Sequence, residues 1–330
     1  MKILVIRFSS IGDIVLTTPV LRCIKNDLPN AEIHYLTKPQ FLPLMENNPH
    51  LKKVWVWSGE VLTSLREEGF DHVVDLHHNL RSLRVKWALG VKSTAFHKLN
   101  LSKYLMVRFK WNRLPEKHIV DRYLETVQKL GVKWDGKGLD FFPSPESEGI
   151  LSKLPDSHNR GFVVVVCGAL KGTKQIPVEH LISVCRNLQR PVVLLGGKQE
   201  ILIGQAIQQE LGSRVFDLCG KTTLGESAVL LRESLAVLTA DTGLMHIAAA
   251  FQKPIVSVWG NTIPEFGMSP FMPQHPALSV VAQVEGLSCR PCSKIGFPTC
   301  PKGHFNCMQK QKYPAIADRI NRFAEQKIVD

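Results

Sequence analysis

The stretch Ala240-Asp241-Thr242-Gly243-Leu244-Met245-His246-Ile247-Ala248-Ala249-Ala250 lies between two short apolar runs, Leu235–Leu238 and Pro254–Trp259. This order predicts a strand, a tight turn, a helix and a second strand. Strands that alternate with helices in this way are typical of an α/β fold with a parallel sheet.

The turn in this stretch carries the polar residues. Asp241 and Thr242 stand where a helix N-cap is expected, and Gly243 lets the backbone approach a ligand closely. Because the N-terminus of a helix presents unpaired N–H groups and the positive end of its dipole, this turn suits a phosphate. His246 follows about one helical turn later on the same face. An ordinary capped helix with a hydrogen-bonded core histidine would have the same pattern.

The start of the chain repeats the arrangement. Lys2–Arg7 is a short apolar run typical of a buried strand, and the apolar spacing over Ile14–Leu28 predicts a helix. Asp13 would then lie at the carboxyl edge of a parallel sheet, where open α/β sheets bind ligands. The turn lacks the glycine-rich patterns of dinucleotide and P-loop sites. A carboxylate there suits a general base, although a lone Asp could simply cap the helix.

The two turns together resemble the two signatures of glycosyltransferase family 9, the ADP-heptose:lipopolysaccharide heptosyltransferases. Ser9–Val15 with Thr17-Thr18-Pro19 matches the first signature, and Asp241–His246 matches the second. Thr173–Pro177 resembles the family's Lys-x-x-Pro turn, which contacts phosphate. Leu195–Glu200 resembles the segment whose Glu meets the nucleoside. Both signatures in one chain are specific, whereas either alone would be weak.

Two sets of predicted strands indicate two α/β halves. A segment rich in Pro and Ser at 139–159 separates them and reads as a linker. The resemblance implies the GT-B fold, with two Rossmann-like domains facing a central cleft: an acceptor-binding domain at 1–150 and a nucleotide-sugar-binding domain at 151–312. Residues 313–330 include a predicted amphipathic helix, which by analogy could pack back on the first domain. Its predicted apolar face consists of Ile316, Ile320, Phe323 and Ile328. The strands expected from the sequence are Lys2–Arg7, Glu32–Leu36, Lys53–Val56, His72–Leu76, Phe162–Cys167, Pro191–Leu195, Val215–Leu218, Leu235–Thr239, Pro254–Trp259 and Leu278–Ala282.

The resemblance also implies roles for individual residues. Asp13 is expected to take the proton of the acceptor hydroxyl. Lys174 and the helix N-terminus at Thr242-Gly243 are expected to stabilise the leaving diphosphate, with His246 as a further donor. Such a site needs no metal cofactor, and the chain has no Asp-x-Asp metal motif. Thr173 and Asp241 complete the expected donor site. Glu200 is the candidate for the adenosine, although it could equally be a solvated surface residue. The expected acceptor contacts are Ser10, Gly12, Asn79 and Arg81.

The charge balance points to an acidic partner. Lys and Arg total 41 against 29 Asp and Glu, which gives a net charge of +12. Eleven of the cations fall between Arg81 and Arg122, interleaved with aromatic residues. This pattern is typical of a nucleic-acid or membrane-interface surface, or simply of solvated helix faces. The resemblance adds an acidic glycolipid acceptor at the inner membrane leaflet. Because no nucleic-acid-binding signature accompanies the charge, we expect no nucleic acid partner. The interleaved aromatic residues are Trp87, Tyr104, Phe109 and Trp111.

No apolar run reaches the length of a membrane span, and no signal peptide is evident. We therefore expect a cytoplasmic protein with peripheral contact at the cytoplasmic face of the inner membrane. A disulfide framework is not expected in that compartment. Four cysteines in a C-x2-C-x7-C-x6-C pattern could bind a structural zinc ion, but the spacing is not a standard ribbon and reduced thiols are favoured. These cysteines are Cys289, Cys292, Cys300 and Cys307.

Other functions remain open from the sequence. An epimerase or hydrolase of nucleotide-sugars, or a transferase of another sugar, would use the same diphosphate site. A non-catalytic nucleotide-binding module is a third possibility, and it predicts that Asp13→Ala leaves activity in the cell unchanged. The sequence alone does not identify the nucleobase, the sugar, the acceptor hydroxyl or the oligomeric state.

Overall fold

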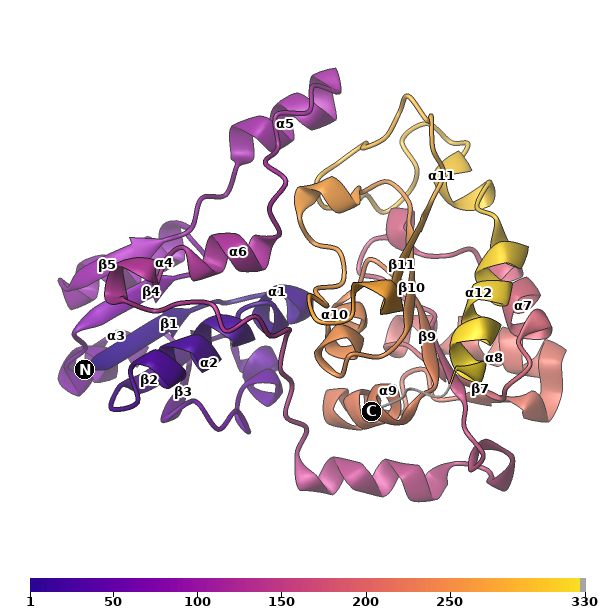
Figure 1. The fold of residues 1–330 in the computed structure, drawn as a ribbon, viewed down its shortest axis with the longest axis horizontal. Coiled ribbons are helices and arrows are strands. Elements are labelled where there is room, and N and C mark those ends of the chain that lie inside the picture. Colours follow the sequence, from indigo (N-terminus) through magenta and orange to yellow (C-terminus); the bar gives the residue numbers. More distant parts are fainter. Residues whose placement is uncertain (327–330) are drawn as a thin grey trace.

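The computed structural model describes residues 1–326, and Figure 1 shows two α/β halves, each built around one parallel sheet. The sheet of the first half has the order β3-β2-β1-β4-β5. Its three central strands, β2, β1 and β4, are almost fully buried, as their apolar runs predict, whereas the edge strands β3 and β5 are partly exposed. The elements are β1 (Lys2–Ile6), α1 (Ile11–Val15), α2 (Thr18–Asp27), β2 (Glu32–Thr37), β3 (Lys53–Val56), α3 (Val61–Glu68), β4 (His72–Asp75), α4 (Leu80–Leu89), β5 (Lys92–Ala95), α5 (Asn100–Phe109) and α6 (Ile119–Leu124).

The sheet of the second half has the order β11-β10-β9-β6-β7-β8, again with every pair parallel. Its elements are β6 (Val163–Val166), α7 (Val178–Asn187), β7 (Val192–Leu195), α8 (Ile201–Leu211), β8 (Val215–Asp217), α9 (Leu224–Glu233), β9 (Ala236–Ala240), α10 (Gly243–Ala250), β10 (Ile255–Trp259), β11 (Ser279–Gln283), α11 (Asn306–Gln309) and α12 (Tyr313–Glu325).

Both sheets have a topological switch point. In the first half the chain moves outward from β1 to β3 and then returns to β4 on the other side of β1. In the second half β6 and β9 are related in the same way. Ligands of doubly wound folds bind at the carboxyl ends of the strands at this point. The structure confirms the predicted GT-B class of two Rossmann-like halves.

The predicted strands are all present, with bounds that agree within two residues. The strand β5 was not predicted, because Lys92-Ser93-Thr94-Ala95 has no apolar run. In the first sheet, alternate side chains pack against opposite layers. Leu4 and Ile6 pack with α3 and α4, whereas Ile3 and Val5 pack with α1 and α2.

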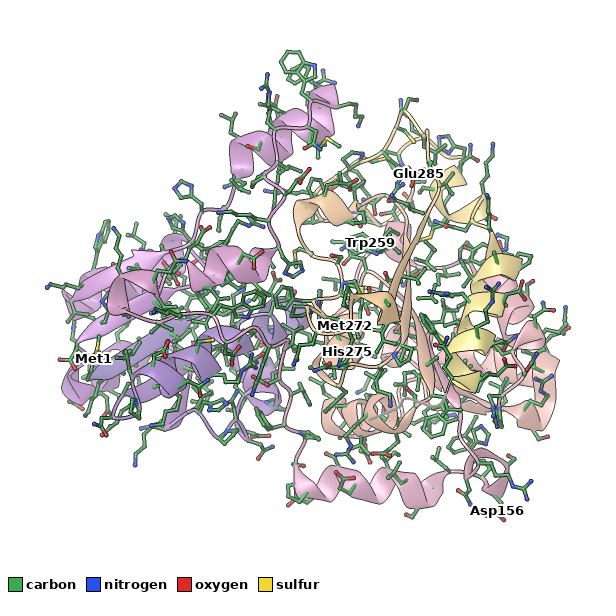
Figure 2. The ribbon with its side chains drawn as sticks, in the orientation of Figure 1. Met1, Asp156, Trp259, Met272, His275 and Glu285 are labelled. Carbon is green, nitrogen blue, oxygen red and sulfur yellow. The ribbon has the colours of Figure 1, made fainter. Side chains whose placement is uncertain are left out.

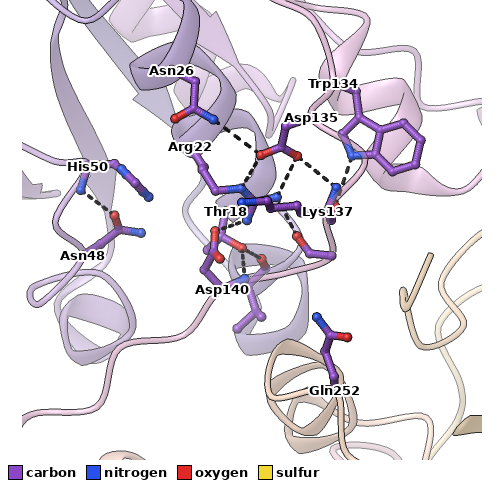
Figure 3. A network of polar contacts seen from close by, with 12 residues as sticks. Thr18, Arg22, Asn26, Asn48, His50, Trp134, Asp135, Lys137, Asp140 and Gln252 are labelled. Atoms are coloured by element: carbon purple, nitrogen blue, oxygen red, sulfur yellow. Dashed lines mark hydrogen bonds and ion pairs between the residues drawn. The ribbon is translucent and has the colours of Figure 1, made fainter. Parts of the chain in front are cut away.

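The chain is anchored on the first half before it crosses to the second. Arg22 of α2 donates from Nε to Asp135 at 2.7 Å, from Nη2 to the Gly138 carbonyl at 2.8 Å, and from Nη1 to Asp140 (Figure 3). The Asp140 N–H in turn donates to Thr18 Oγ1 at 2.9 Å. The segment predicted as a linker then forms a short 3-10 helix (η3, Pro145–Lys153) packed against α9.

The last helix packs differently from the prediction. α12 lies against α7 and beside β9 and β10, and its buried face belongs to the core of the second half. The expectation that this helix packs back on the first domain is therefore wrong for its described part. Ile316, Ile320 and Phe323 are buried in the same cluster as the apolar residues of α7. Ile328, which the predicted apolar face also included, lies outside the described residues.

The two halves share a continuous core at their junction. Figure 2 shows Met272 between them, and it belongs to the same buried cluster as Val5 and Ile14. The N–H of Ile119 in α6 donates to the Gly267 carbonyl of the second half at 2.8 Å. Within residues 1–326, helices long and apolar enough to cross a bilayer are absent.

Candidate active site

The two switch-point turns meet directly, because α1 packs against α10. A methyl group added to Gly12 would lie 2.4 Å from His246 Cδ2, and one added to Gly243 would lie 2.6 Å from Ile11 Cγ2. Both glycines therefore allow close contact between the halves. Gly12 has this packing role, and its predicted contact with the acceptor stays a prediction. The contact brings Asp13 and the second-half turn to one small region.

Asp13 lies at the first turn of α1 and is held from two sides. Arg7 Nη2 lies 2.6 Å from Asp13 Oδ1. Ser10 donates to Oδ2 from its hydroxyl at 2.6 Å and from its backbone N–H at 3.2 Å. Burial alone would raise the pKa of Asp13, but the charge of Arg7 and the Ser10 hydrogen bonds outweigh it and lower the pKa. Asp13 is therefore a carboxylate at neutral pH.

Arg7 also belongs to the site, although in the sequence it reads only as the end of an apolar strand. Its side chain is almost fully buried, and Nε donates to the Ser9 carbonyl at 2.7 Å while Nη1 donates to the Leu76 carbonyl at 2.5 Å. These bonds leave Nη2 directed at Asp13. Arg7 thus joins the ends of β1 and β4 to the candidate base.

The other predicted acceptor residues have structural roles. Asn79 caps α4, because its Oδ1 accepts from the Ser82 N–H at 2.9 Å. Arg81 lies over aromatic rings, with its guanidinium carbon 5.2 Å from the Phe8 ring and 5.5 Å from the Trp57 ring. Ser10 is exposed but directs its hydroxyl to Asp13. These side chains therefore stabilise the turns at the starts of α4 and α1.

On the second half, Asp241 and Lys174 form an ion pair. Lys174 Nζ lies 2.5 Å from Asp241 Oδ2, and both side chains are mostly buried. Thr262 Oγ1 donates to the same carboxylate oxygen at 2.9 Å. This arrangement fixes one ammonium group beside the N-terminus of α10, whose cap Thr242 accepts from the Met245 N–H at 3.4 Å.

His246 lies between the two turns. It is 2% exposed, and its Nδ1 has no hydrogen-bond partner among the described residues. Burial lowers the pKa of His246 to about 4, against the opposing charges of Asp241 and Asp13. The ring is therefore neutral at pH 7 and can both donate and accept a hydrogen bond. Its position supports the predicted role as an additional donor.

Glu200 is buried, which excludes the alternative of a solvated surface residue. Its side chain is packed closely by Gly168 and Gly196, where an added methyl group would lie 2.3 Å and 2.8 Å from it. Its Oε2 accepts from the Gly197 N–H at 2.8 Å, and Oε1 accepts from Gln175 Nε2 at 3.4 Å. Glu200 thus lies beside the carboxyl end of β6, near the turn that carries Lys174.

Thr173 is buried and bonded to a loop far along the chain: Oγ1 accepts from the Phe297 N–H at 2.8 Å and donates to the Phe297 carbonyl at 3.1 Å. Its predicted contact with the donor stays a prediction. An added methyl group on Gly172 would lie 2.1 Å from the Pro298 carbonyl oxygen. Thr173 therefore positions the Lys174 turn against the cysteine segment.

The four C-terminal cysteines are free thiols, and no three of their sulfur atoms lie within 4.8 Å of one another. Burial raises the pKa of Cys292 and of Cys307 to about 11, so both are protonated at neutral pH. Among residues 1–326, the only group of three ligand atoms within 4.8 Å of one another is Glu32, His34 and Glu68. There Trp55 Nε1 donates to His34 Nδ1 at 3.0 Å, which leaves the proton of the neutral ring on Nε2 and disfavours a metal at that atom.

A hollow of about 470 Å³ opens on the first half, between the end of β4 and the start of α5. It is lined by His78 and residues 97–102. Lys98 lies in this lining, and its pKa is lowered by burial and by Arg7. Burial also lowers the pKa of Lys103 to about 8, with Asp13 near enough to oppose the shift. The hollow therefore has one cation in its lining, Lys98, and Lys103 follows the lining segment directly in the chain; the charge of Asp13 acts on both lysines.

Comparison with known proteins adds to this geometry. The family profile described as Glycosyltransferase family 9 (heptosyltransferase) matches residues 59–296. Lipopolysaccharide heptosyltransferase 1 of Campylobacter coli is 25% identical over 79% of this chain and 84% of its own length. Lipopolysaccharide heptosyltransferase 2 of Escherichia coli is 25% identical over 81% of this chain and 84% of its own.

Solved structures show the same fold. That of the Escherichia coli ADP-heptose heptosyltransferase II has a TM-score of 0.74 at 21% identity and covers 98% of each chain. That of Escherichia coli heptosyltransferase WaaC with ADP has a TM-score of 0.69 at 20% identity and covers 98% of this chain and 100% of the other.

Proposed function

The chain belongs to glycosyltransferase family 9, and from this premise we propose that it moves a heptose from ADP-heptose to the inner core of lipopolysaccharide. The acceptor is Kdo-lipid A or its heptosylated form. Relatives named as lipopolysaccharide heptosyltransferases and a similar structure with ADP support this donor and acceptor. The transfer proceeds by direct displacement with inversion and uses no metal ion.

One observation carries the mechanism: the α1–α10 contact places Asp13 on one side and the Lys174–Asp241 pair on the other. In the reaction the acceptor oxygen forms a bond to the anomeric carbon while the bond from that carbon to the diphosphate oxygen breaks. The proton of the acceptor hydroxyl passes to a carboxylate oxygen of Asp13. A single displacement of this kind inverts the anomeric carbon.

The leaving ADP takes up negative charge as the bond breaks. Lys174 and the N–H groups at the start of α10 stabilise this charge, because they are already oriented before the reaction. The α10 helix spans eight residues, long enough for its terminus to act in this way. Neutral His246, between both carboxylates, donates a further hydrogen bond. Glu200, bonded to Gly197, binds the adenosine end of the donor.

Arg7 is a positioning residue for Asp13. Its charge keeps the carboxylate ionised, and its bonds to two backbone carbonyls fix the direction from which the carboxylate is held. The nearby basic hollow accepts the acidic groups of the acceptor, with Lys98 and Lys103 as the cations. The substrate hydroxyl then approaches Asp13 from the first half.

The test uses purified protein, ADP-heptose and two acceptors, Kdo-lipid A and heptosyl-Kdo-lipid A, without added metal. We expect release of ADP together with a mass increase of one heptose on one of the acceptors. ADP release without any acceptor would favour a hydrolase. Transfer only from another nucleotide-sugar would keep the glycosyltransferase but discard the heptose.

A further inference from the structure

The helix α5 has no buried residue. Figure 1 shows it standing clear of the first sheet and its covering helices. Four large apolar side chains on it or just after it are exposed: Leu101 at 71%, Tyr104 at 58%, Phe109 at 49% and Trp111 at 60%. A helix with so much apolar surface outside any core is typical of an interaction surface.

The aromatic side chains gather at the carboxyl end of α5. The Tyr104 and Phe109 rings lie 6.3 Å apart, and the Phe109 and Trp111 rings lie 5.3 Å apart. Lys110 closes the helix, and its Nζ donates to the Pro291 carbonyl of the second half at 2.7 Å. This bond ties the exposed cluster to the cysteine segment, so the cluster has a defined position.

The segment that carries this cluster has charges of one sign. Residues 76–115 contain no Asp or Glu. Three cations, Arg108, Lys110 and Arg113, directly flank the aromatic cluster. A surface of this kind is complementary to anionic lipid head groups, each cation adding to the attraction. The cations of residues 76–115 are Arg81, Arg84, Lys86, Lys92, Lys98, Lys103, Arg108, Lys110 and Arg113.

We propose that α5 and residues 110–113 dock on the surface of an anionic lipid bilayer, with Tyr104, Phe109 and Trp111 in the interfacial region. Tyr and Trp prefer this region because one part of the ring system is apolar and the other is polar. Leu101, an exposed aliphatic residue, favours lipid over nucleic acid, because single-stranded nucleic acids bind chiefly by stacking on aromatic rings.

The position of α5 relative to the basic hollow links bilayer docking to acceptor binding. The first residues of α5 line the hollow, and the aromatic cluster lies at the other end, roughly 15 Å along the helix axis. A lipid-anchored acceptor could therefore keep its acyl chains in the bilayer while its head group enters the hollow beside Asp13. This step rests on the proposed function, whereas the charge and exposure of α5 do not.

The experiment is co-sedimentation with vesicles of phosphatidylcholine alone and with one quarter phosphatidylglycerol. The triple variant Tyr104→Ser/Phe109→Ser/Trp111→Ser is compared with Leu202→Ser, which removes a side chain 77% exposed on α8. We expect the wild type and Leu202→Ser to bind the anionic vesicles alike, the triple variant to bind at least tenfold less, and neutral vesicles to bind weakly throughout. Equal binding by the triple variant, or preference for a single-stranded RNA over the anionic vesicles, would overturn the proposal.

Transfer to a deacylated, water-soluble acceptor and ADP binding separate this inference from the proposed function. The triple variant should retain both, because its changes lie away from Asp13 and Lys174. Vesicle binding by a wild type that shows no heptose transfer would overturn the function and leave the docking surface intact. Loss of transfer to the soluble acceptor in a folded triple variant would instead make α5 part of the acceptor site and contradict the docking role.

Discussion

Arg7 Nη2 and Asp13 Oδ1 are 2.6 Å apart, and this pair sets the ionisation of the candidate base. Burial of a carboxyl group raises its pKa, and in this site the guanidinium reverses that effect. With this pair, Asp13 is ionised, and so able to accept a proton, at neutral and mildly acidic pH. A carboxylate with a lowered pKa is a weak base. The proton is therefore transferred late in the reaction, when the acceptor oxygen has already become acidic through its new bond to the anomeric carbon.

The first prediction concerns Arg7→Met. Without the guanidinium, burial is expected to dominate and the pKa of Asp13 to rise, so the carboxylate protonates as the pH falls through a higher value. The rate of transfer should then fall in mildly acidic buffer, where the wild type stays level. A decrease in kcat of about 10- to 100-fold at pH 7 is expected from misplacement of the base. Arg7→Lys, which keeps the charge, should restore the level pH profile; an unchanged profile in Arg7→Met would contradict the positioning role.

The second prediction concerns the ion pair on the donor side. Lys174→Ala removes the fixed cation next to the N-terminus of α10, and ADP should bind about 10- to 100-fold more weakly, a loss of roughly 1.4–3 kcal/mol. Calorimetric titration with ADP measures this. Lys2→Ala is the matched control, because Lys2 forms an ion pair with Glu68 (Nζ to Oε1, 2.8 Å) at the start of β1, the opposite edge of the first sheet from the site. Equal effects of the two substitutions would argue against a diphosphate site at Lys174.

A third prediction follows from Lys103, whose pKa is lowered to about 8. If its ammonium binds an acidic group of the acceptor, that contribution is present below pH 8 and is lost as the pH rises through this value. KM for the acceptor should therefore increase above pH 8, whereas KM for the donor should not. In Lys103→Arg, the guanidinium stays charged and the increase should disappear. A KM for the acceptor that stays constant up to pH 9 in the wild type would rule out this role.

The fourth prediction tests the contact between the halves. Gly12→Ala would place a methyl group 2.4 Å from His246 Cδ2, so the two helices must separate. Overpacking of this kind costs about 1–3 kcal/mol, which thermal or urea unfolding can measure. Gly59→Ala is the control, since nothing lies within 4 Å of the position of its added methyl group. Both variants melting like the wild type would mean that the α1–α10 contact is not tight.

The sequence predicted the architecture well for a physical reason. Strands of a parallel sheet are covered on both faces, so they read as continuous apolar runs such as Val163–Val166. The edge strand β5 is polar, so it lacks the apolar run from which the other strands are predicted. The predicted site turns follow β1, β6 and β9, and the switch-point rule explains why they lie together.

The site was harder to predict where side chains form hydrogen bonds with residues far away in the sequence. Thr173 bonds to Phe297 and Arg7 bonds to the carbonyl of Leu76, and neither pairing leaves a local pattern in the sequence. Asn79 caps a helix and Arg81 lies over an aromatic ring, whereas their predicted contacts with the acceptor stay predictions. The sequence also does not indicate which half α12 packs against, because an amphipathic face does not specify its partner.

The role of Asp13 as the base is tested most directly by Asp13→Asn, measured for ADP binding and for heptose transfer in the same buffer without added metal. Asn keeps the size of the side chain but cannot take the proton. We expect ADP binding within about twofold of the wild type, because the donor turns are intact, and transfer slower by about 10²–10⁴-fold. Transfer at the wild-type rate would contradict the assignment of Asp13 as the base, and loss of ADP binding would place this residue in the donor site instead.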